Sequence, residues 1–301
     1  MNLAEELQKV IYNVRVNEPM SQHTSFGVGG PADIFMEVGD EEELRKIVSL
    51  CNQFHTQYFI LGGGTNLLVR DEGIRGVVIK LVGEFKRIEV SDKSIIAGAG
   101  ISLAKLVNWA YAKGLSGLEF AVGIPGTIGG AVIGNAGVAE KSIGNCLNYI
   151  RVLDKEACLV EKIKKLAPKE CGFSYRNSRL KKYIILDVEI LLTKSKICSI
   201  VNRLERYKQK RGNTQPVKTK SAGCIFKNPP DNFAGKLIDE AGLKSFRLGG
   251  AYVSQKHANF ILNDGTATAM DILDLIAEIK EKVFEKFGVK LEEEIVIIGE
   301  D

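Results

Sequence analysis

Apolar and polar residues along the first part of this chain follow two different periods. Between residues 41 and 53 apolar side chains recur at i, i+3, i+4 and i+7, which predicts an amphipathic helix. The apolar run 58–61 predicts a short buried strand that ends at three consecutive glycines and resumes over 67–69. Two apolar stretches around a polar turn then predict a hairpin between 87 and 97, and a helical period returns over 102–113.

The last third of the chain contains the strongest helical pattern. That helix begins near Thr268, where Asp271 is a capping partner, and Gly288 ends it. A closing strand over 295–298 places Glu294 at a strand edge. The buried stripe of the helix is expected to comprise Ile272, Leu275, Ile276, Ile279 and Val283.

Composition narrows the class of protein. The 301 residues carry a net charge of +4, from 41 basic and 37 acidic residues spread along the chain, which argues against a dedicated nucleic-acid binder. No stretch approaches the roughly 20 apolar residues of a membrane helix, and the N-terminus lacks a signal-peptide pattern, so a cytoplasmic protein is expected. The six cysteines and three histidines lack zinc-site spacing, so we expect reduced thiols and no metal.

A first glycine-rich segment, 61–69, places three glycines and two small polar residues directly after the predicted buried strand. Successive backbone N–H groups in such a turn can bind an anion, and the missing Cβ atoms let a pyrophosphate approach closely. The segment is neither a P-loop nor GxGxxG, so neither ATP nor a Rossmann-bound dinucleotide is indicated. A purely structural glycine turn is an equal alternative.

A second segment, 123–137, has six glycines among fifteen residues and no charged side chain. Because helix and strand interiors disfavour that much glycine, we expect an extended loop. The absence of charge favours a cofactor cradle over an ordinary surface loop. Two such loops fit an extended dinucleotide better than a mononucleotide.

Several further motifs occur in a fixed order along the chain. They are His23–Asp33 (HTSFGVGGPAD), Tyr175–Ser178 (YRNS), Ser221–Pro229 (SAGCIFKNP), Gly250–Phe260 (GAYVSQKHANF) and Leu291–Ile295 (LEEEI). With the two glycine-rich segments, they make nearly the whole chain resemble the UDP-N-acetylenolpyruvoylglucosamine reductase (UDP-N-acetylmuramate dehydrogenase) family. The short interval between Arg176 and Cys224 is similar to the shorter class of that family, which lacks an extra tyrosine-bearing loop.

The resemblance implies an α+β fold, with a two-subdomain FAD-binding fold of the vanillyl-alcohol-oxidase (PCMH) type and a C-terminal α+β substrate domain. The expected division is an N-terminal helix over 1–20, FAD-binding subdomains over 21–98 and 99–208, and a substrate-binding domain over 209–301. It also implies a flavoprotein oxidoreductase of peptidoglycan precursor synthesis. In that family NADPH reduces FAD, and hydride passes from flavin N5 to the enolpyruvyl group of UDP-N-acetylglucosamine enolpyruvate, which yields UDP-N-acetylmuramate.

The implied reaction gives three residues a chemical role. After hydride addition, negative charge develops beside the substrate carboxylate, so a cation must hold that carboxylate and an acid must deliver a proton. By resemblance, Arg176 is the cation, Cys224 is the proton donor, and Glu294 helps to stabilise or protonate the intermediate. The best-known members carry serine where this chain has Cys224, but a thiol with a pKa of about 8.5 can do the same work.

Each of these three residues also has a structural alternative. Arg176 would otherwise form a surface ion pair, Cys224 would be a small buried residue, and Glu294 would belong to an exposed acidic cluster with Glu292 and Glu293. The resemblance favours the catalytic roles.

The same motifs imply the binding residues. FAD is expected to be held non-covalently, because no histidine or cysteine lies within the glycine-rich segments. Some members carry an arginine two residues after the catalytic glutamate; Val296 stands there in this chain, so one anion contact is missing or supplied elsewhere. A structural role for His257 is an equal alternative to substrate binding. The expected FAD-binding residues are Gly62, Gly63, Gly64, Thr65, Asn66, Leu67, Gly123, Pro125, Gly126, Thr127, Gly130, Asn135 and Gly137, and the expected substrate-binding residues are Tyr175, Arg211, Lys227, Asn228 and His257.

The expected partners are small molecules, namely the UDP-sugar and NADPH, with no nucleic acid and no membrane, and a monomer is expected. Roles in cell wall biogenesis, cell shape and cell division would follow from the implied reaction. The second hypothesis is another FAD oxidoreductase of the same fold, acting on an alcohol or hydroxy acid. It would need an acid/base set different from Arg176, Cys224 and Glu294.

Overall fold

The computed structural model describes residues 3–155 and 163–300, and the chain divides into two compact units. The first glycine-rich segment is split between them, because Gly62 and Gly63 belong to unit 1 while Gly64–Leu67 belong to unit 2. Unit 1 comprises the chain up to Val16, Ile34–Gly63 and Gly76–Lys210, and unit 2 comprises Asn17–Asp33, Gly64–Arg75 and the chain from Arg211 onward.

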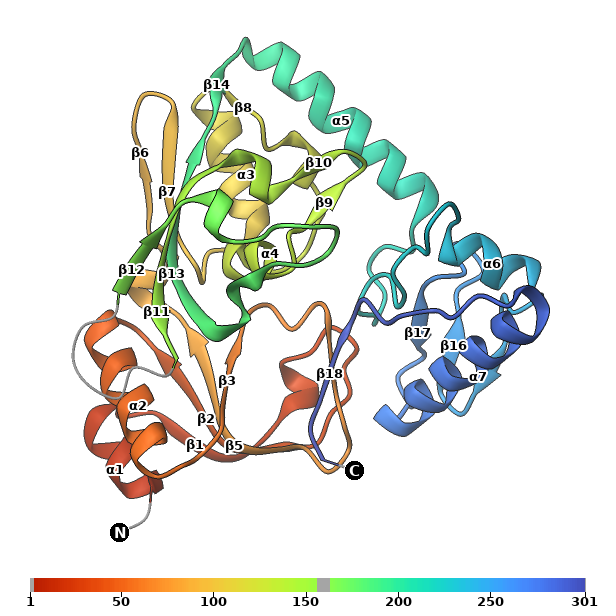
Figure 1. The fold of residues 1–301 in the computed structure, drawn as a ribbon, viewed down its shortest axis with the longest axis horizontal. Helices are drawn as coiled ribbons and strands as arrows, with labels where there is room; N and C mark the ends of the chain where they lie inside the picture. The colour runs from red at the N-terminus through yellow and green to blue at the C-terminus, as the bar shows by residue number, and fades with distance from the viewer. Residues whose placement is uncertain (1–2, 156–162, 301) are drawn as a thin grey trace. The chain divides into compact units, whose positions relative to one another are not determined.

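Two sheets form the framework of unit 1 (Figure 1). One has the strand order β1–β2–β5–β3, and the other has the order β12–β11–β13–β7–β6. The two-stranded pairs β8–β14 and β9–β10 lie outside these sheets. The strands are β1 (Val14–Pro19), β2 (Pro31–Val38), β3 (Tyr58–Leu61), β5 (Ile74–Leu81), β6 (Ile88–Val90), β7 (Ser94–Gly98), β8 (Leu115–Ser116), β9 (Gly137–Val138), β10 (Lys141–Ser142), β11 (Leu147–Asp154), β12 (Ile163–Leu166), β13 (Tyr183–Leu191) and β14 (Thr193–Lys194).

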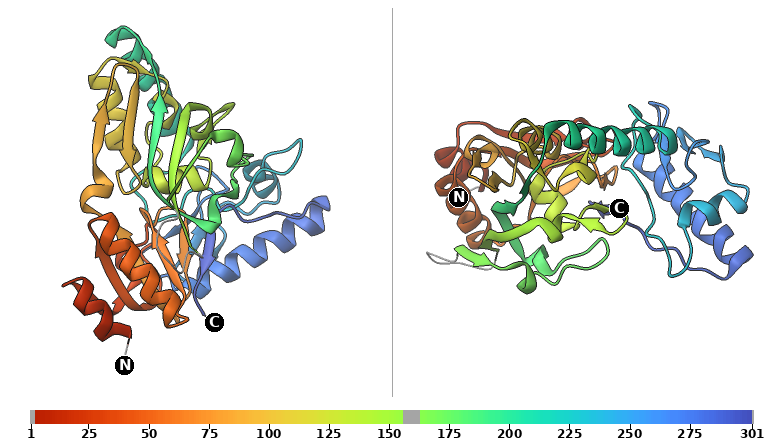
Figure 2. Two further views of the ribbon diagram at one scale, coloured as in Figure 1. Left: turned by 60° about the vertical axis from the view of Figure 1, so that its left-hand side comes forward. Right: turned by 90° about the horizontal axis from the view of Figure 1, so that it is seen from above.

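The helices of unit 1 agree with most of the predicted periods. The predicted helix over 41–53 is confirmed, and Asp40 caps it by accepting a hydrogen bond from the Glu43 N–H at 2.8 Å. Its apolar stripe is buried in the core of the unit. Figure 2 shows α1 and α2, in red and orange, as neighbouring helices. The helices are α1 (Leu3–Val10), α2 (Glu41–Gln53), α3 (Leu103–Ala112), α4 (Ile128–Ile133) and α5 (Ile197–Thr214), which extends into unit 2.

The N-terminal helix is shorter than the predicted span of residues 1–20. Helix α1 ends at Val10, and strand β1 follows. The buried stripe of Leu3 and Leu7 ends with Ile11, just after α1, and the next residues, Tyr12 and Asn13, are exposed. Val14 and Val16 are β-branched, which favours the strand conformation that the chain adopts there.

The prediction of an extended loop over 123–137 is wrong at its centre, where helix α4 forms. Thr127 caps this helix by accepting a hydrogen bond from the Gly130 N–H at 3.3 Å. Gly129 explains why a glycine-rich sequence is helical here. A Cβ at Gly129 would lie 3.0 Å from the Ala99 Cβ, so the helix packs directly against the backbone at Ala99. This close packing offsets the low helix propensity of glycine.

A small antiparallel sheet and two helices make up most of unit 2 (Figure 1). Helix α7 packs against strands β15 and β16, and its predicted buried stripe is confirmed. The predicted capping box of Thr268 and Asp271 is present, and Gly288 ends the helix with a φ of +67°. The elements are β4 (Leu67–Val69), β15 (Arg247–Leu248), β16 (Ala251–Val253), β17 (Ile261–Asn263), β18 (Val296–Ile298), α6 (Ala234–Glu240) and α7 (Ala269–Phe287).

Strands β4 and β18 pair in parallel within unit 2, so the residues after the first glycine-rich turn lie beside the C-terminal strand. The apolar run that predicted β4 is fully buried, and Leu68 belongs to the core of this unit. This pairing places Asn66 and Glu294, each just before its strand, close to one another.

Three features of the described residues bear on the predicted class of protein. No helix within them has the length and apolar character needed to span a bilayer. No group of three or more His, Cys, Asp and Glu side chains in residues 3–155 and 163–300 is arranged to hold a metal ion. The cysteines in those ranges are free thiols, and Cys158 lies outside them.

Candidate functional site

The two glycine-rich segments meet within unit 1. Gly62 follows β3 directly, and a Cβ at this position would lie 2.9 Å from Oγ1 of Thr127 in the other segment. Gly123 and Gly126 have φ angles of +74° and +106°, a region that favours glycine. The Thr127 side chain therefore packs directly against the backbone at Gly62, and the two segments adjoin there.

The remainder of the first segment is held by backbone contacts within unit 2. A Cβ at Gly64 would lie 1.9 Å from the His23 carbonyl oxygen, and the Gly64 carbonyl accepts a hydrogen bond from the Ser25 N–H at 2.9 Å. Gly64 has a φ of +63°, and Leu67 is buried at the start of β4. Gly63, between the two anchored parts, is exposed.

Arg176 lies in a tight turn that is attached to the second glycine-rich segment. Ser174 and Asn177 pair as an isolated antiparallel bridge, and Arg176 between them has a φ of +53°. The Asn135 side chain donates a hydrogen bond to the Ser174 carbonyl at 2.9 Å, and the guanidinium of Arg176 donates one to the Gly137 carbonyl at 3.1 Å. A positive φ at a non-glycine residue is uncommon and is often maintained at functional sites.

Tyr175 stands beside Arg176 and is largely exposed. The Arg176 guanidinium carbon lies 5.3 Å from the centre of the Tyr175 ring, within the range of a cation–π interaction. Asn135, predicted as a cofactor-binding residue, is buried, and its two side-chain atoms bond to Ser174 and Gly144. The structure therefore shows Asn135 supporting the turn that carries Arg176.

Cys224 and Glu294 come from segments that pair with one another in unit 2. Phe226 and Glu293 form an isolated antiparallel bridge, and the Glu294 N–H donates a hydrogen bond to the Ile225 carbonyl at 2.7 Å. The sequence separates these segments by about 70 residues, but the fold makes them neighbours. The predicted proton donor and the predicted catalytic glutamate are thus on adjacent segments.

Asn259 is a supporting residue that the sequence analysis did not identify. Its side chain is buried and makes two hydrogen bonds to Phe226, accepting from the N–H at 2.9 Å and donating to the carbonyl at 2.8 Å. Its own carbonyl accepts from the Ile225 N–H at 2.9 Å. Asn259 lies in the Gly250–Phe260 motif. The polar residues of that motif were the sequence signal from which Asn259 could have been identified.

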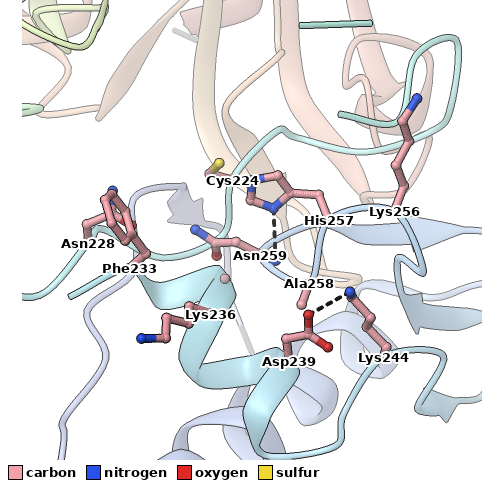
Figure 3. Close-up of a pocket in the computed structure, with 11 residues that line it drawn as sticks. Cys224, Asn228, Phe233, Lys236, Asp239, Lys244, Lys256, His257, Ala258 and Asn259 are labelled. Atoms are coloured by element: carbon pink, nitrogen blue, oxygen red, sulfur yellow. Dashed lines mark hydrogen bonds and ion pairs between the residues drawn. The ribbon is translucent and has the colours of Figure 1, made fainter. Parts of the chain in front are cut away.

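A pocket of about 380 Å³ opens beside Cys224 in unit 2 (Figure 3). Cys224 and His257 lie toward one end of the view, and Lys236, Asp239 and Lys244 lie toward the other. Lys244 forms an ion pair with Asp239 at 2.6 Å, and Lys236 forms a longer one with Glu240 at 3.8 Å, so the cationic excess of the lining comes mainly from Lys256. The lining residues are Cys224, Asn228, Phe233, Gly235, Lys236, Asp239, Lys244, Lys256, His257, Ala258 and Asn259.

The pocket contains three of the predicted site residues, namely Cys224, Asn228 and His257. Its lysines were not predicted, because isolated lysines are common on protein surfaces and gave no sequence signal. A neutral apolar pocket would not suit a phosphorylated ligand, whereas these cations do.

His257 has a defined tautomer in this pocket. Its Nδ1 accepts a hydrogen bond from the Asn259 N–H at 3.2 Å, so the proton of the neutral ring is on Nε2. Burial lowers the pKa of His257 below its ordinary value of 6.5, and the charge of Lys244 lowers it further, although a backbone hydrogen bond opposes this shift. The ring is therefore neutral at physiological pH.

The other predicted substrate residues lie outside the pocket lining. Lys227 pairs with Glu292 at 3.2 Å, and Glu293 pairs with Lys280 at 2.7 Å. Arg211 lies in the last turn of α5. The acidic residues that precede Glu294 are therefore engaged with lysines and do not form an isolated acidic cluster with it.

Two protein families match this chain, one in its N-terminal part and one in its C-terminal part. Residues 32–161 match the FAD binding domain family, and residues 215–298 match the family described as UDP-N-acetylenolpyruvoylglucosamine reductase, C-terminal domain. The second match covers the pocket, Cys224 and Glu294.

Full-length relatives give the same result. The chain is 44% identical over 302 residues to the UDP-N-acetylenolpyruvoylglucosamine reductase of Caldanaerobacter subterraneus subsp. tengcongensis, covering 99% of this chain and 98% of that protein. It is 42% identical over 303 residues to the reductase of Clostridioides difficile, covering 100% and 98% of the two chains.

Solved structures agree on the fold. The crystal structure of UDP-N-acetylenolpyruvylglucosamine reductase from Thermus caldophilus has a TM-score of 0.82 and 38% identity, over 95% of this chain and 98% of that one. A berberine bridge enzyme variant, a reticuline dehydrogenase, matches 65% of this chain and 44% of its own at a TM-score of 0.51 and 13% identity, which shows a shared FAD-binding fold alone.

These matches confirm the predicted fold, which combines an FAD-binding domain of the PCMH and vanillyl-alcohol-oxidase type with a C-terminal substrate domain. They do not favour the second hypothesis of an oxidase acting on an alcohol or hydroxy acid. The chain belongs to the UDP-N-acetylenolpyruvoylglucosamine reductase family.

Proposed function

We propose that this chain reduces the enolpyruvyl group of UDP-N-acetylglucosamine enolpyruvate to UDP-N-acetylmuramate, with FAD as cofactor and NADPH as electron donor. The observation that most supports this function is the pairing of the Cys224 and Glu294 segments beside a pocket with several lysines. An acid next to a cationic pocket suits the protonation of an anionic substrate that carries a diphosphate.

Anaerobic half-reactions of the purified holoprotein test this proposal. NADPH should bleach the flavin absorbance, and subsequent addition of the enolpyruvyl UDP-sugar should restore it. UDP-N-acetylglucosamine, which lacks the enolpyruvyl group, is the control and should leave the flavin reduced. A flavin that stays reduced with both sugars would contradict the proposed reaction.

We propose that backbone groups of the two glycine-rich segments, within 62–67 and 123–137, hold FAD non-covalently. The contact between Gly62 and Thr127 within unit 1 supports this assignment, because it brings the backbone of the first segment against the second. The chemistry that bound FAD supplies is a hydride for the terminal CH2 carbon of the enolpyruvyl group. The side chains of the chain then have to manage the charge and the proton.

Cys224 is the proposed proton donor to the carbon next to the carboxylate. It lines the pocket, and its segment pairs with that of Glu294. A thiol donates its proton more readily than a serine hydroxyl does and is still mostly protonated at neutral pH. Glu294 stabilises the intermediate or takes part in its protonation.

Arg176 is the proposed cation for the substrate carboxylate. The positive φ of Arg176 and its hydrogen bond to Gly137 define the direction of the guanidinium before any ligand is present. A guanidinium can grip a carboxylate with two parallel hydrogen bonds, which an ammonium group cannot do. Preorganised positive charge stabilises the carboxylate as charge develops beside it.

The variant Arg176→Lys should slow substrate-dependent reoxidation by roughly 10- to 150-fold, because a hydrogen bond to a charged group contributes about 1.5–3 kcal/mol. Reduction by NADPH should change little. Stopped-flow absorbance of the flavin measures both steps. Lys105→Arg, on the exposed side of α3, is a charge-conserving control that should behave as wild type. Wild-type reoxidation in Arg176→Lys would leave Arg176 as a structural residue of the turn.

We propose that the pocket beside Cys224 binds the UDP-sugar, with Asn228 and His257 as hydrogen-bonding groups. Lys256, a cation in the pocket lining whose described partner is the Gly212 carbonyl, offers the anion contact that is absent at Val296. Further substrate contacts are proposed for Tyr175, Arg211 and Lys227. In this assignment Nε2 of His257 donates to the substrate, because Nδ1 is engaged by the backbone.

The lowered pKa of His257 predicts a pH dependence of stability. Because the folded-state pKa lies below the unfolded value of 6.5, the unfolded chain binds this proton first as the pH falls. The free energy of unfolding should therefore decrease from pH 6.5 down to the lowered pKa, and this contribution should level off below it. Urea denaturation of the apoprotein across this range measures the effect. His257→Gln, which cannot titrate, should show a shallower decrease, and an equal slope in both proteins would contradict the assignment.

The proposal also covers the domain division, the oligomeric state, the cellular location and the electron donor. We keep 21–98 and 99–208 as the FAD-binding subdomains and 209–301 as the substrate-binding domain. A monomer in the cytoplasm that uses NADPH in cell wall biogenesis is proposed, with effects on cell shape and cell division. Sedimentation velocity of the holoprotein tests the monomer, and a comparison of NADPH with NADH in the reductive half-reaction tests the donor.

A further inference from the structure

Asn66 bonds to the backbone at Glu294 and at Val296. Its Nδ2 donates a hydrogen bond to the Glu294 carbonyl at 3.1 Å, and its own carbonyl accepts one from the Val296 N–H at 2.9 Å. From the opposite direction, the Glu294 N–H donates to the Ile225 carbonyl at 2.7 Å. The backbone of Glu294 is therefore held between the segment that carries Cys224 and the first glycine-rich segment.

Core packing does not account for the side chain of Asn66. The neighbouring anchors are apolar, since Leu68 on β4 is fully buried and Ile295 is 5% exposed, whereas Asn66 is exposed. An exposed asparagine fills no core volume. Its side-chain amide makes one described contact, with the carbonyl of Glu294. The amide therefore acts on the orientation of the peptide that carries Glu294.

We propose that Asn66 is a positioning residue for the reductase reaction, and that its side-chain amide sets the orientation of Glu294 relative to Cys224. The inference rests on the proposed role of Glu294. It also divides the functions of the first glycine-rich segment. Backbone groups of that segment serve the cofactor, and the Asn66 side chain serves the proton-transfer part of the site.

Loss of the amide has a specific structural consequence. In Asn66→Ala the Glu294 carbonyl loses its donor, while the backbone bond from Val296 to residue 66 is retained. Asn66→Asp presents an acceptor to the same carbonyl and adds repulsion. The β4–β18 pairing begins at Leu67 and does not use the Asn66 side chain, so we expect both variants to keep it and the change to be confined to the peptide at Glu294.

The first test separates the two half-reactions in Asn66→Ala and Asn66→Asp. FAD affinity and the rate of reduction by NADPH should stay within about twofold of wild type. The maximal rate of substrate-dependent reoxidation should fall roughly three- to tenfold, as expected for one hydrogen bond, with half-saturation by substrate unchanged. An equal loss in FAD affinity and in both half-reactions would overturn the inference, because Asn66 would then be a cofactor ligand alone.

A second readout does not depend on activity. In the apoprotein, hydrogen exchange of the peptide spanning 293–296 should quicken several-fold in Asn66→Ala, because the Glu294 peptide becomes less restrained. Unchanged exchange would also overturn the inference, because the amide would then not restrain the Glu294 peptide. Circular dichroism verifies that both variants are folded, and Asn66→Asp serves if the alanine variant is not.

Asp71 offers a matched control on the same segment. Its carboxylate accepts hydrogen bonds from the N–H groups of Ala269 and Met270, both at 2.9 Å, at the start of α7. Asp71 therefore anchors the segment without contacting Glu294. Asp71→Asn should lower thermal stability and leave the reoxidation rate unchanged. A reoxidation defect in Asp71→Asn equal to that of Asn66→Ala would show a general loosening and overturn the specific role of Asn66.

A double-mutant cycle with Glu294→Gln tests the coupling directly. If Asn66 acts through Glu294, Asn66→Ala should add no further loss of reoxidation rate in the Glu294→Gln background. Additive losses would overturn the inference while leaving the proposed role of Glu294 intact. If Glu294→Gln alone reoxidises at the wild-type rate, the proposed role of Glu294 fails and the inference fails with it. The single variants therefore distinguish the two failures.

Discussion

Replacing Cys224 with alanine should leave FAD binding and NADPH-dependent flavin reduction nearly intact and slow substrate-dependent reoxidation by roughly 10²- to 10⁴-fold. The first two steps do not use the proton that Cys224 is proposed to donate. Reoxidation requires that proton at the carbon beside the carboxylate. Stopped-flow absorbance of the flavin resolves both half-reactions in one sample.

Cys224→Ser is the matched control, because a hydroxyl keeps a proton at nearly the same position. It should retain substantial activity and should remove any inactivation by thiol reagents that depends on this residue. Total labelling is not a valid measure, because Cys198 is also an exposed free thiol and is accessible to the reagent. If Cys224→Ala reoxidises as fast as wild type, Cys224 is structural and Glu294 becomes the first candidate for the donor.

Gly63→Val should yield folded protein without bound FAD, and hence without reductase activity. Gly63 is exposed and its φ lies outside the left-handed region, so valine causes no backbone strain there. The branched side chain would instead occupy space beside the proposed cofactor surface. Gly126 is less suitable for this test, because its φ of +106° would strain any side chain regardless of the cofactor.

The ratio of flavin absorbance to protein absorbance after gel filtration measures FAD occupancy, and circular dichroism verifies the fold. Gly212→Val is the control, because a Cβ at Gly212 has no atom within 4 Å, and it should retain full FAD occupancy. Full occupancy in Gly63→Val would contradict the assignment of the first segment to FAD.

Local patterns in the sequence determined several elements of this protein. The helix of residues 41–53 and helix α7 were predictable because their apolar stripes and caps depend on neighbours within a few residues. The capping box at Thr268 and the left-handed Gly288 are further examples. The ordered motifs likewise determined the family, because they are read along the chain without knowledge of which segments meet.

Other features depend on contacts between residues that are far apart in the sequence, and only the tertiary structure determined these features. The helical centre of the second glycine-rich segment exists because Gly129 packs on Ala99, which outweighs the low helix propensity of glycine. The pairing of the Cys224 and Glu294 segments and the contact of Asn66 with Glu294 join residues far apart in the chain. The local pattern of apolar and polar residues cannot predict such hydrogen bonds. They join remote segments, and the number of residues between two segments does not determine how close they lie in the fold.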